Sequence, residues 1–399
     1  MKIATVCSGI GSPEQALKEL NIPHEIAFAC EIDNYARQTY LANFTPNQMY
    51  TDLTAEEWDK PKQYSDLFIG GIPCQAFSLA GKRLGELDKR GLLFYDFYRY
   101  VKNQQPKVFI IENVKGLLSD NNGITFQNWC SLLGRSMNTH VNMFNHEDSL
   151  LYNLHFKVLN SKDFGVPQNR ERVFLVGIRN DLPNTFRFPI GERLTKRLKD
   201  ILEPEVDDKY YLSDSAIQSI INNQDNLQKP NINPEIAATL QSPGNSCGTY
   251  KGANFIEEPY CVAMRGRNPE NPSDRTTGAN TEQRLEPNSQ GITNTITSVQ
   301  KDNLIVTKPL FSYRIDNPIS TENEFFVTLR ANAGGKLKGV GIIHQTKIRR
   351  LTPLECMRLQ GYSDSFIKPC SDSQTYKQAG NSITVNVMKA IIKNLLPIL

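Results

Sequence analysis

Short apolar segments alternate with amphipathic segments over the first 180 residues, and this alternation limits the possible folds more than any other feature. Strand-like runs fall at 2–7, 25–30, 66–72, 107–112 and 173–178, with helix-like stretches between them at 13–20, 33–43 and 92–104. Such alternation is typical of an α/β domain with a doubly wound, mostly parallel sheet. Ligands of these sheets bind at the carboxyl ends of the strands. The residues that follow each strand are therefore the first candidates for a functional site.

The sequence changes character after residue 188. From 189 to 345 Asn, Thr, Ser, Gly and Pro become frequent, the helical periodicity fades, and short β-like runs recur. We therefore expect a second, smaller domain that is rich in loops and β-strands. Three runs, at 237–240, 294–297 and 327–330, resemble one another, which indicates either a weak internal repeat or simply residues that favour strands. After 348 helical patterns return, with a capping-box start at Thr352-Pro353-Leu354-Glu355 and an apolar helix at about 382–396.

The composition excludes some classes of protein without identifying the function. Of the 399 residues 39% are hydrophobic, and the net charge of +3 is compatible with a polyanionic partner but does not require one. The eight cysteines form no C-x-x-C pair and the five histidines lie at no metal-ligand spacing, so we expect reduced thiols and no metal. No apolar run has membrane-spanning length and no signal-peptide pattern is present, which predicts a cytoplasmic protein without membrane association.

The first strand runs into a glycine-containing turn, Ser8-Gly9-Ile10-Gly11-Ser12-Pro13. The glycines allow a tight turn and a close approach to a ligand, and Ser12 is expected to cap a helix that has Pro13 at its first position. Alone, such a turn is more often a plain connection. Glu31 and Asp52 at the ends of the next strands strengthen the ligand interpretation, because two carboxylates suit the hydroxyls and amine of a nucleoside. No Walker-type lysine follows, which disfavours a phosphate-bearing nucleotide.

Three later strand ends carry groups that can converge on one small ligand. Cys74 follows a strand in Pro73-Cys74-Gln75, Glu112 ends the strand at 107–112, and Arg170 and Arg172 precede the strand at 173–178. A cysteine by itself is more often inert and buried, and either arginine could instead pair with a surface acid.

Taken together, these motifs closely resemble the DNA (cytosine-5) methyltransferase family in its compact bacterial or phage restriction–modification form. The ordered matches are Gly9/Gly11, Glu31, Asp52, Pro73-Cys74-Gln75, Arg90-Gly91, Glu112-Asn113-Val114, Gln168-x-Arg170-x-Arg172, Arg350-Leu351-Thr352-Pro353-x-Glu355 and Gly380-Asn381-Ser382. They run along the whole chain except 189–345, the place of that family's variable target-recognition domain. The resemblance implies a Rossmann-like catalytic domain of 1–188 plus 376–399 that binds S-adenosylmethionine, a target-recognition domain of 189–345, and a connecting hinge of 346–375.

For the chemistry, the resemblance implies that the Cys74 thiolate adds to C6 of cytosine. Glu112 would hold N3 and the 4-amino group, which makes C5 nucleophilic toward the methyl group of S-adenosylmethionine. This is covalent catalysis. Arg170 and Arg172 would supply positive charge near the thiolate, the base and a phosphate, with Arg172 favoured for O2 of the base.

The resemblance also implies the cofactor pocket. Glu31 would bind the ribose hydroxyls, Asp52 with the Leu53 backbone would bind the adenine edge, and Asn381 and Ser382 would close the pocket from the far end of the chain. The full set expected to bind the cofactor is Cys7, Gly9, Ile10, Gly11, Glu31, Ile32, Asp52, Leu53, Pro73, Leu93, Asn381 and Ser382. Cys7 departs from the family, in which an aromatic residue commonly stands at this position.

The partner implied is double-stranded DNA, from which the target base must be flipped out. The loop 75–91 would be a mobile lid, with Gln75, Lys82, Arg83 and Arg90 as DNA contacts, while Arg265, Arg267, Thr328 and Arg330 would contact bases or phosphates from 189–345. We expect a monomer, and a cognate restriction endonuclease stays open. The alternatives are a tRNA cytosine-5 methyltransferase and a catalytically inactive DNA-binding protein. The intact Cys74, Glu112, Arg170 and Arg172 argue against the inactive protein.

Overall fold

The computed structural model describes two compact units of the chain. Described residues are 1–58, 63–72, 93–137, 146–211 and 351–399, and beyond these only the strand backbones at 140–141, 260–267, 282–287, 304–306, 325–326, 342–343 and 348–350. Met1–Lys196 together with Cys356–Leu399 forms the first unit, and most of Arg197–Glu355 forms the second.

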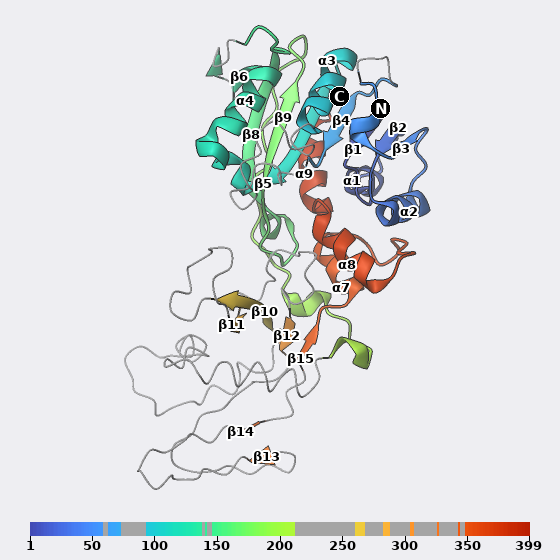
Figure 1. Cartoon of the computed structure of the whole chain (residues 1–399), viewed down its shortest axis with the longest axis vertical. Helices are drawn as coiled ribbons and strands as arrows, with labels where there is room; N and C mark the ends of the chain where they lie inside the picture. The colour runs from blue at the N-terminus through green and yellow to red at the C-terminus, as the bar shows by residue number, and fades with distance from the viewer. Residues whose placement is uncertain are drawn as a thin grey trace, which may run out of the picture. The chain divides into compact units, whose positions relative to one another are not determined.

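A sheet of nine strands forms the centre of the first unit (Figure 1). Its strands are β1 Lys2–Val6, β2 Glu25–Cys30, β3 Met49–Tyr50, β4 Leu67–Gly70, β5 Val108–Val114, β6 Gly134–Met137, β7 His140–Val141, β8 Tyr152–Asn160 and β9 Glu171–Ile178. The order is β3-β2-β1-β4-β5-β9-β8-β6-β7. The strands from β3 to β5 are parallel, and β9 runs antiparallel between β5 and β8. The predicted mostly parallel sheet is confirmed.

The described helices include all those predicted from the sequence. Those of the first unit are α1 Ser12–Glu19, α2 Asn34–Asn43, α3 Leu93–Gln104, α4 Ile124–Leu133, α8 Asp372–Asn381 and α9 Val385–Leu395, with short 3-10 helices η1 Leu53–Ala55, η3 Lys115–Leu118, η4 Asp120–Gly123 and η5 Ser161–Phe164. The helix α7 Pro353–Leu359 begins in the second unit and ends in the first. The carboxyl-terminal α9 packs against α1. Sequence reasoning did not identify α4, β6 or β8.

An aromatic core beneath α3 fixes the positions of the strand ends. Phe68 of β4 stacks on Phe97 of α3 with ring centroids 4.5 Å apart, and the centroid of the Tyr100 ring lies 4.1 Å from that of Phe68. Phe28 of β2 and Phe109 of β5 complete this buried cluster. Because the core fixes three parallel strands in register, the residues that follow them share one edge of the sheet.

One local prediction is confirmed and another is wrong. The Thr352 amide donates to Glu355 Oε2 at 2.8 Å while the Glu355 amide donates to Thr352 Oγ1 at 3.2 Å, which is the predicted capping box at the start of α7. Ser12 does not cap α1. The cap position is Gly11, with φ of 87°, and the Ser12 hydroxyl bonds to Tyr362 and Ser382 instead. The Ser12 hydroxyl, which local sequence preference assigns to the helix cap, is therefore engaged in tertiary hydrogen bonds instead.

The described part of the second unit is β-structure with short 3-10 helices. β10 Tyr260–Arg267, β11 Glu282–Pro287, β12 Leu304–Val306 and β15 Ile348–Arg350 form an antiparallel sheet in the order β11-β10-β12-β15, beside a pair of β13 Phe325–Phe326 and β14 Ile342–Ile343 and the 3-10 helices η6 Leu198–Ile201 and η7 Asp208–Tyr210. The three similar runs at 237–240, 294–297 and 327–330 lie outside the described residues. Over the described part of the chain, no helix is long and apolar enough to cross a membrane.

Candidate active site

The turn after β1, residues 7–12 and hereafter the glycine turn, has three left-handed residues. Cys7, Gly9 and Gly11 have φ of 48°, 55° and 87°. The Ser8 amide donates to the Cys30 carbonyl at 3.0 Å, which ties the turn to the end of β2. A Cβ atom at Gly9 would meet nothing within 4 Å, so open space lies over this residue. At Gly11 a Cβ atom would lie 2.4 Å from the Phe44 ring, which requires glycine for packing.

Glu31 and its neighbours Ile32, Asp52 and Leu53 form the site that we call the Glu31 corner. Glu31 Oε2 accepts from the Gly9 amide at 2.7 Å, and Oε1 accepts from the Asp33 amide at 2.9 Å. Burial raises the pKa of this carboxyl, and the two amides partly oppose that rise. The Glu31 amide also donates to the Tyr50 carbonyl at 3.1 Å, which places the ends of β2 and β3 side by side. Asp52 follows Tyr50 by two residues in the sequence.

Two further features distinguish the Glu31 corner. Ile32 is 71% exposed although its side chain is large and apolar, and it directly follows the half-buried Glu31. Asp52 Oδ1 accepts from the Thr54 amide and hydroxyl, both at 2.8 Å, so this carboxylate is held by its own 3-10 turn. Leu53 is buried. The corner therefore combines two oriented carboxylates with an uncovered apolar side chain, as expected where a small ligand packs.

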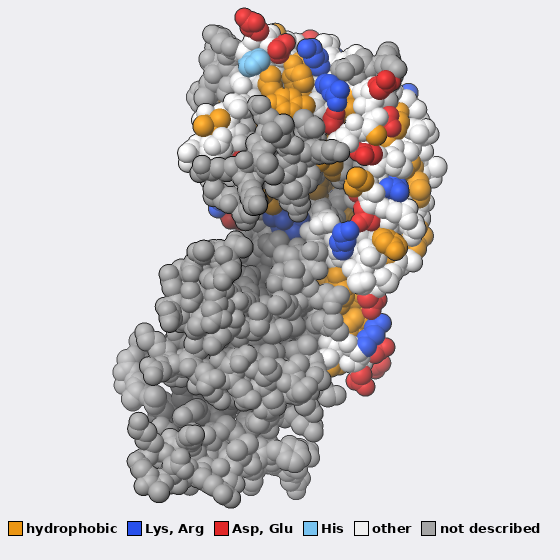
Figure 2. Space-filling view, viewed as in Figure 1, with side chains coloured by type: hydrophobic (Ala, Val, Ile, Leu, Met, Phe, Trp, Pro, Cys, Tyr) orange, Lys and Arg blue, Asp and Glu red, His pale blue; other side chains and the backbone are white. Residues whose placement is uncertain are grey.

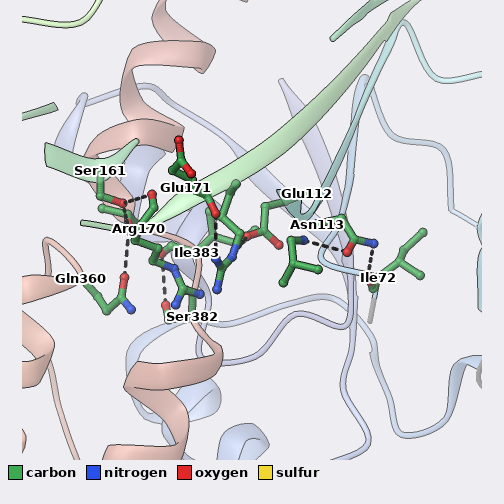
Figure 3. Close-up of polar contacts among 12 residues, drawn as sticks. Ile72, Glu112, Asn113, Ser161, Arg170, Glu171, Gln360, Ser382 and Ile383 are labelled. Atoms are coloured by element: carbon green, nitrogen blue, oxygen red, sulfur yellow. Dashed lines mark hydrogen bonds and ion pairs between the residues drawn. The ribbon is translucent and has the colours of Figure 1, made fainter. Parts of the chain in front are cut away.

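Glu112, Arg170 and Arg172 form a second site, hereafter the Glu112 corner (Figure 3). Glu112 lies near the end of β5, and Arg172 Nε is 3.2 Å from Glu112 Oε1 because β9 runs antiparallel beside β5. Arg170 is 3% exposed, and its Nη2 donates to the Ser382 carbonyl at 2.9 Å. Sequence reasoning expected Cys74, Glu112 and the two arginines to converge. The structure brings Glu112 and the two arginines together, while Cys74 lies outside the described residues.

Burial controls the electrostatics of the Glu112 corner. It raises the pKa of the Glu112 carboxyl, while the charges of Arg172 and Arg170 act in the opposite direction. Burial also lowers the pKa of Arg170 to about 9, with the charge of Arg172 adding to this effect and Glu112 opposing it. A buried carboxyl whose pKa is raised retains a proton to higher pH, which suits a group that must share a proton with a ligand.

The Glu112 corner is joined to the segment that carries the predicted nucleophile. Asn113 Nδ2 donates to the Ile72 carbonyl at 2.9 Å, and Ile72 precedes Cys74 by two residues in the sequence. A Cβ atom at Gly71 would lie 3.7 Å from the Cys7 carbonyl oxygen and 3.9 Å from Glu112 Oε2. The glycine turn and the Glu112 carboxylate therefore approach the same point of the chain.

The other predicted site residues fall into two groups. Leu93 is half-buried at the start of α3, Asn381 is exposed at the end of α8, and Ser382 is buried with its hydroxyl toward Ser12 and Tyr362. Outside the described residues lie Pro73, Cys74, Gln75, Lys82, Arg83, Arg90, Thr328 and Arg330, while Arg265 and Arg267 are described only as backbone of β10. The roles of both groups stay predictions.

On the described part of the face in Figure 2, charge alone does not mark a nucleic-acid surface, because Lys and Arg side chains are interspersed with Asp and Glu. Among the residues that the structure describes, no group of three or more His, Cys, Asp or Glu side chains could hold a metal ion. The two corners are thus the features from which function must be argued.

Comparison with known proteins identifies the class and then the family. A family model described as C-5 cytosine-specific DNA methylase matches residues 1–396. The orphan methyltransferase M.SPRI of Bacillus phage SPR is 32% identical, with 99% of this chain and 97% of the relative covered. The type II methyltransferase M.HpaII of Haemophilus parainfluenzae is 33% identical, with 98% of this chain and 87% of the relative covered.

Solved structures agree on the fold. The S. pombe Dnmt2 methyltransferase superposes with a TM-score of 0.56 at 17% identity, covering 100% of this chain and 98% of that one. A putative DNA modification methyltransferase from an E. coli prophage gives 0.55 at 19% identity, covering 100% and 99%. The fold is therefore that of the Rossmann-like methyltransferases. The chain belongs to the C-5 cytosine-specific DNA methylase family and is a DNA (cytosine-5)-methyltransferase.

Proposed function

We propose that this chain transfers a methyl group from S-adenosylmethionine to C5 of a cytosine flipped out of a specific short duplex sequence, through a covalent adduct between Cys74 and C6. The observation that carries the proposal is the Glu112 corner, in which a buried carboxyl of raised pKa faces two arginines. The next residue after Glu112, Asn113, donates a hydrogen bond to the Ile72 carbonyl, and Ile72 lies two residues before Cys74 in the sequence.

The residues of this chain would act on the cytosine in a defined order. The Cys74 thiolate forms a bond to C6, and the electron pair of the C5–C6 double bond moves toward C5 and N3. Glu112 holds a proton at N3, so that negative charge does not accumulate on the ring and C5 becomes nucleophilic. After C5 has gained its methyl group, a water molecule takes the C5 proton, and the electron pair of that C–H bond re-forms the C5–C6 double bond. The Cys74–C6 bond breaks, its electron pair leaves with the Cys74 thiolate, and the N3 proton returns to Glu112.

The two arginines are suited to different tasks. Arg170 is almost fully buried and already donates to the Ser382 carbonyl, so we assign it to orienting Glu112 and the 382 segment. The Arg172 side chain is 17% exposed and contacts Glu112 through Nε. Its Nη1 donates to the Glu171 carbonyl at 2.8 Å, which leaves the donors of Nη2 for a substrate, and we assign Arg172 to O2 of the base.

The Glu31 corner fits a nucleoside cofactor. The open space over Gly9, the exposed Ile32 and the fixed Glu31 carboxylate supply room, apolar surface and an oriented acceptor. We assign Glu31 to the ribose hydroxyls, and Asp52 with the Leu53 amide to the adenine edge. When bound, S-adenosylmethionine supplies a methyl group made electrophilic by its sulfonium.

The partner and setting follow from the family. We propose double-stranded DNA as the substrate, read by 189–345 through residues such as Arg265 and Arg330, and a monomer that acts in the cytoplasm. Names of the relatives include both type II and orphan methyltransferases. Both arrangements, with and without a cognate restriction endonuclease, are therefore compatible with this chain.

The test is bisulfite sequencing of DNA from a methylation-free bacterial host that expresses the chain. We expect protected cytosines in one or a few fixed sequence contexts, and none in a host that expresses Cys74→Ala at an equal soluble level. Protection absent from both hosts would contradict DNA methylation. Methylated cytosine in the tRNA of the same cells would then favour an RNA substrate, and its absence would favour an inactive DNA-binding protein.

A further inference from the structure

Three hydroxyl groups from distant parts of the chain meet inside the first unit. Ser12 Oγ lies 2.7 Å from both Tyr362 Oη and Ser382 Oγ, and Tyr362 Oη lies 2.8 Å from Ser382 Oγ. All three residues are buried. We call this triangle the hydroxyl ring. Ser12 and Tyr362 are 350 residues apart in the sequence, so no local pattern could have indicated it.

The proton count of the hydroxyl ring favours a closed cycle. Three hydroxyls supply three protons for three short contacts, so each oxygen can donate once and accept once around the ring. Ser382 Oγ also lies 3.2 Å from the Ile383 carbonyl, a longer contact. Burial raises the pKa of the Tyr362 hydroxyl, which therefore stays protonated and able to donate. Bonds in such a cycle polarise and strengthen one another.

The hydroxyl ring connects the two ends of the active site. Ser12 belongs to the glycine turn and begins α1. Ser382 lies beyond α8, and its backbone carbonyl accepts the hydrogen bond from Arg170 Nη2 at 2.9 Å (Figure 3). Arg170 in turn acts electrostatically on Glu112. A shift of the glycine turn would therefore be transmitted to Ser382, both directly from Ser12 and by way of Tyr362, and from Ser382 to the Arg170 guanidinium.

We propose that Tyr362 is a positioning residue whose hydroxyl holds the glycine turn and the Arg170 guanidinium in one arrangement and so couples cofactor binding to the Glu112 corner. This inference rests on the proposed function for the identity of the two ligands. Among the three residues of the hydroxyl ring, Tyr362 is the best one to substitute, because contacts other than its hydroxyl hold its aromatic side chain in place. The ring packs on Phe366 with centroids 4.4 Å apart, and the backbone amide donates to the Met357 carbonyl.

The variant Tyr362→Phe removes the hydroxyl and keeps the packed ring. Ser12 and Ser382 can still bond to each other, but the cycle is open. We expect KM for S-adenosylmethionine to rise and kcat to fall, each about 3- to 10-fold, as for loss of a net hydrogen bond. The matched control is Tyr152→Phe, which removes another buried hydroxyl, one that donates to the Pro106 carbonyl at 2.7 Å. Tyr152→Phe should lower Tm by about as much as Tyr362→Phe does, but it should leave KM and kcat unchanged.

Hydrogen exchange on the full chain without cofactor or DNA separates coupling from a local structural role. With Tyr362→Phe, exchange should rise together in peptides that cover Ser12 and Ser382, whereas Tyr152→Phe should change neither. A rise confined to peptides around Tyr362, or kinetic constants that match those of the Tyr152 control, would overturn the inference. If the wild-type chain transfers no methyl group while Tyr362→Phe still shows the paired rise in exchange, the proposed function is contradicted and the hydroxyl ring stands.

Discussion

The Glu31 corner contains a half-buried carboxyl and the Glu112 corner a buried one, and in both corners burial is the main cause of a raised pKa. They differ in what faces the carboxylate. Glu31 accepts from two backbone amides, which are fixed by the turn that bears them. Glu112 faces the side-chain guanidinium of Arg172. The two carboxyls are therefore suited to different tasks. The fixed amides orient the Glu31 carboxylate as an acceptor, whereas the Arg172 cation can rearrange around a substrate and around a proton that moves between Glu112 and that substrate.

The surroundings extend this difference. Beside Glu31 an exposed Ile32 and open space over Gly9 offer contact area for a ligand. Beside Glu112 the Asn113 amide holds the backbone that leads to Cys74. We therefore expect substitutions at the Glu31 corner to change affinity, and substitutions at the Glu112 corner to change the rate of transfer.

The largest effect is expected for Cys74→Ala. Loss of the nucleophile removes the covalent step, so methyl transfer should become undetectable while binding of duplex DNA and of S-adenosylmethionine persists. Transfer is measured with a tritiated methyl donor, and binding by filter retention and calorimetry. The control is Cys370→Ala, a half-buried cysteine that contacts α2. Residual transfer by Cys74→Ala above that of a no-enzyme sample would remove the nucleophile from the proposal.

Glu112→Gln should give the next largest effect. The amide keeps the shape of the side chain but cannot give or take a proton, so kcat should fall by about 10²- to 10⁴-fold, as for lost general acid–base help. The KM for S-adenosylmethionine should stay within a few-fold of wild type, because this carboxyl faces arginines rather than the glycine turn. A variant that loses cofactor affinity and retains its rate would reverse the assignment of the two corners.

Much of this arrangement could be predicted from the sequence. Apolar runs predicted the core strands, and the residues at the ends of the parallel strands included Glu31 and Glu112, because parallel strands deliver such residues to one edge. Arg172 reaches the same edge because it lies at the start of β9, which runs antiparallel to β5. What local patterns could not give was pairing across long separations. Ser12 has the type and place of a helix cap, yet its hydroxyl bonds to Tyr362 and Ser382. The different partners of the Glu31 and Glu112 carboxylates likewise depend on tertiary contacts.

Glu31→Gln should produce a smaller effect, and one of a different kind. A glutamine offers one oxygen where the two amides of Gly9 and Asp33 each require an acceptor, so one amide would face an NH₂ group. Cofactor affinity should fall about 10-fold or more, as for lost bonds to a charged group, while kcat at saturating cofactor stays within a few-fold. Calorimetry and saturation kinetics measure the two. Glu25→Gln, an exposed acid that starts the same strand, is the control.

The smallest catalytic effect is expected for Glu14→Gln. This variant tests whether burial of a carboxyl is enough to give it a role in catalysis. Glu14 of α1 is fully buried, and its Oε1 accepts from the hydroxyls of Thr5 at 2.8 Å and Tyr40 at 2.7 Å. Burial raises its pKa, and these bonds act in the opposite direction. No cation contributes to this shift, in contrast to Glu112. We therefore expect kcat of Glu14→Gln to stay within about twofold of wild type.

Stability, by contrast, should reveal Glu14 through its pH dependence. A carboxyl whose folded pKa is raised stabilises the protein fully below its ordinary pKa of 4.5, and this contribution is lost as pH rises toward and through the folded pKa. The wild-type free energy of unfolding should therefore fall by up to about 1.4 kcal/mol per pH unit in that window, relative to Glu14→Gln, whose amide does not ionise. Urea unfolding of both proteins at a series of pH values from 5 upward measures the difference. If the free energies of unfolding of the two proteins change with pH in parallel, the pKa of Glu14 is not raised in the folded chain. The comparison between Glu14 and Glu112 as two buried carboxyls of raised pKa would then fail.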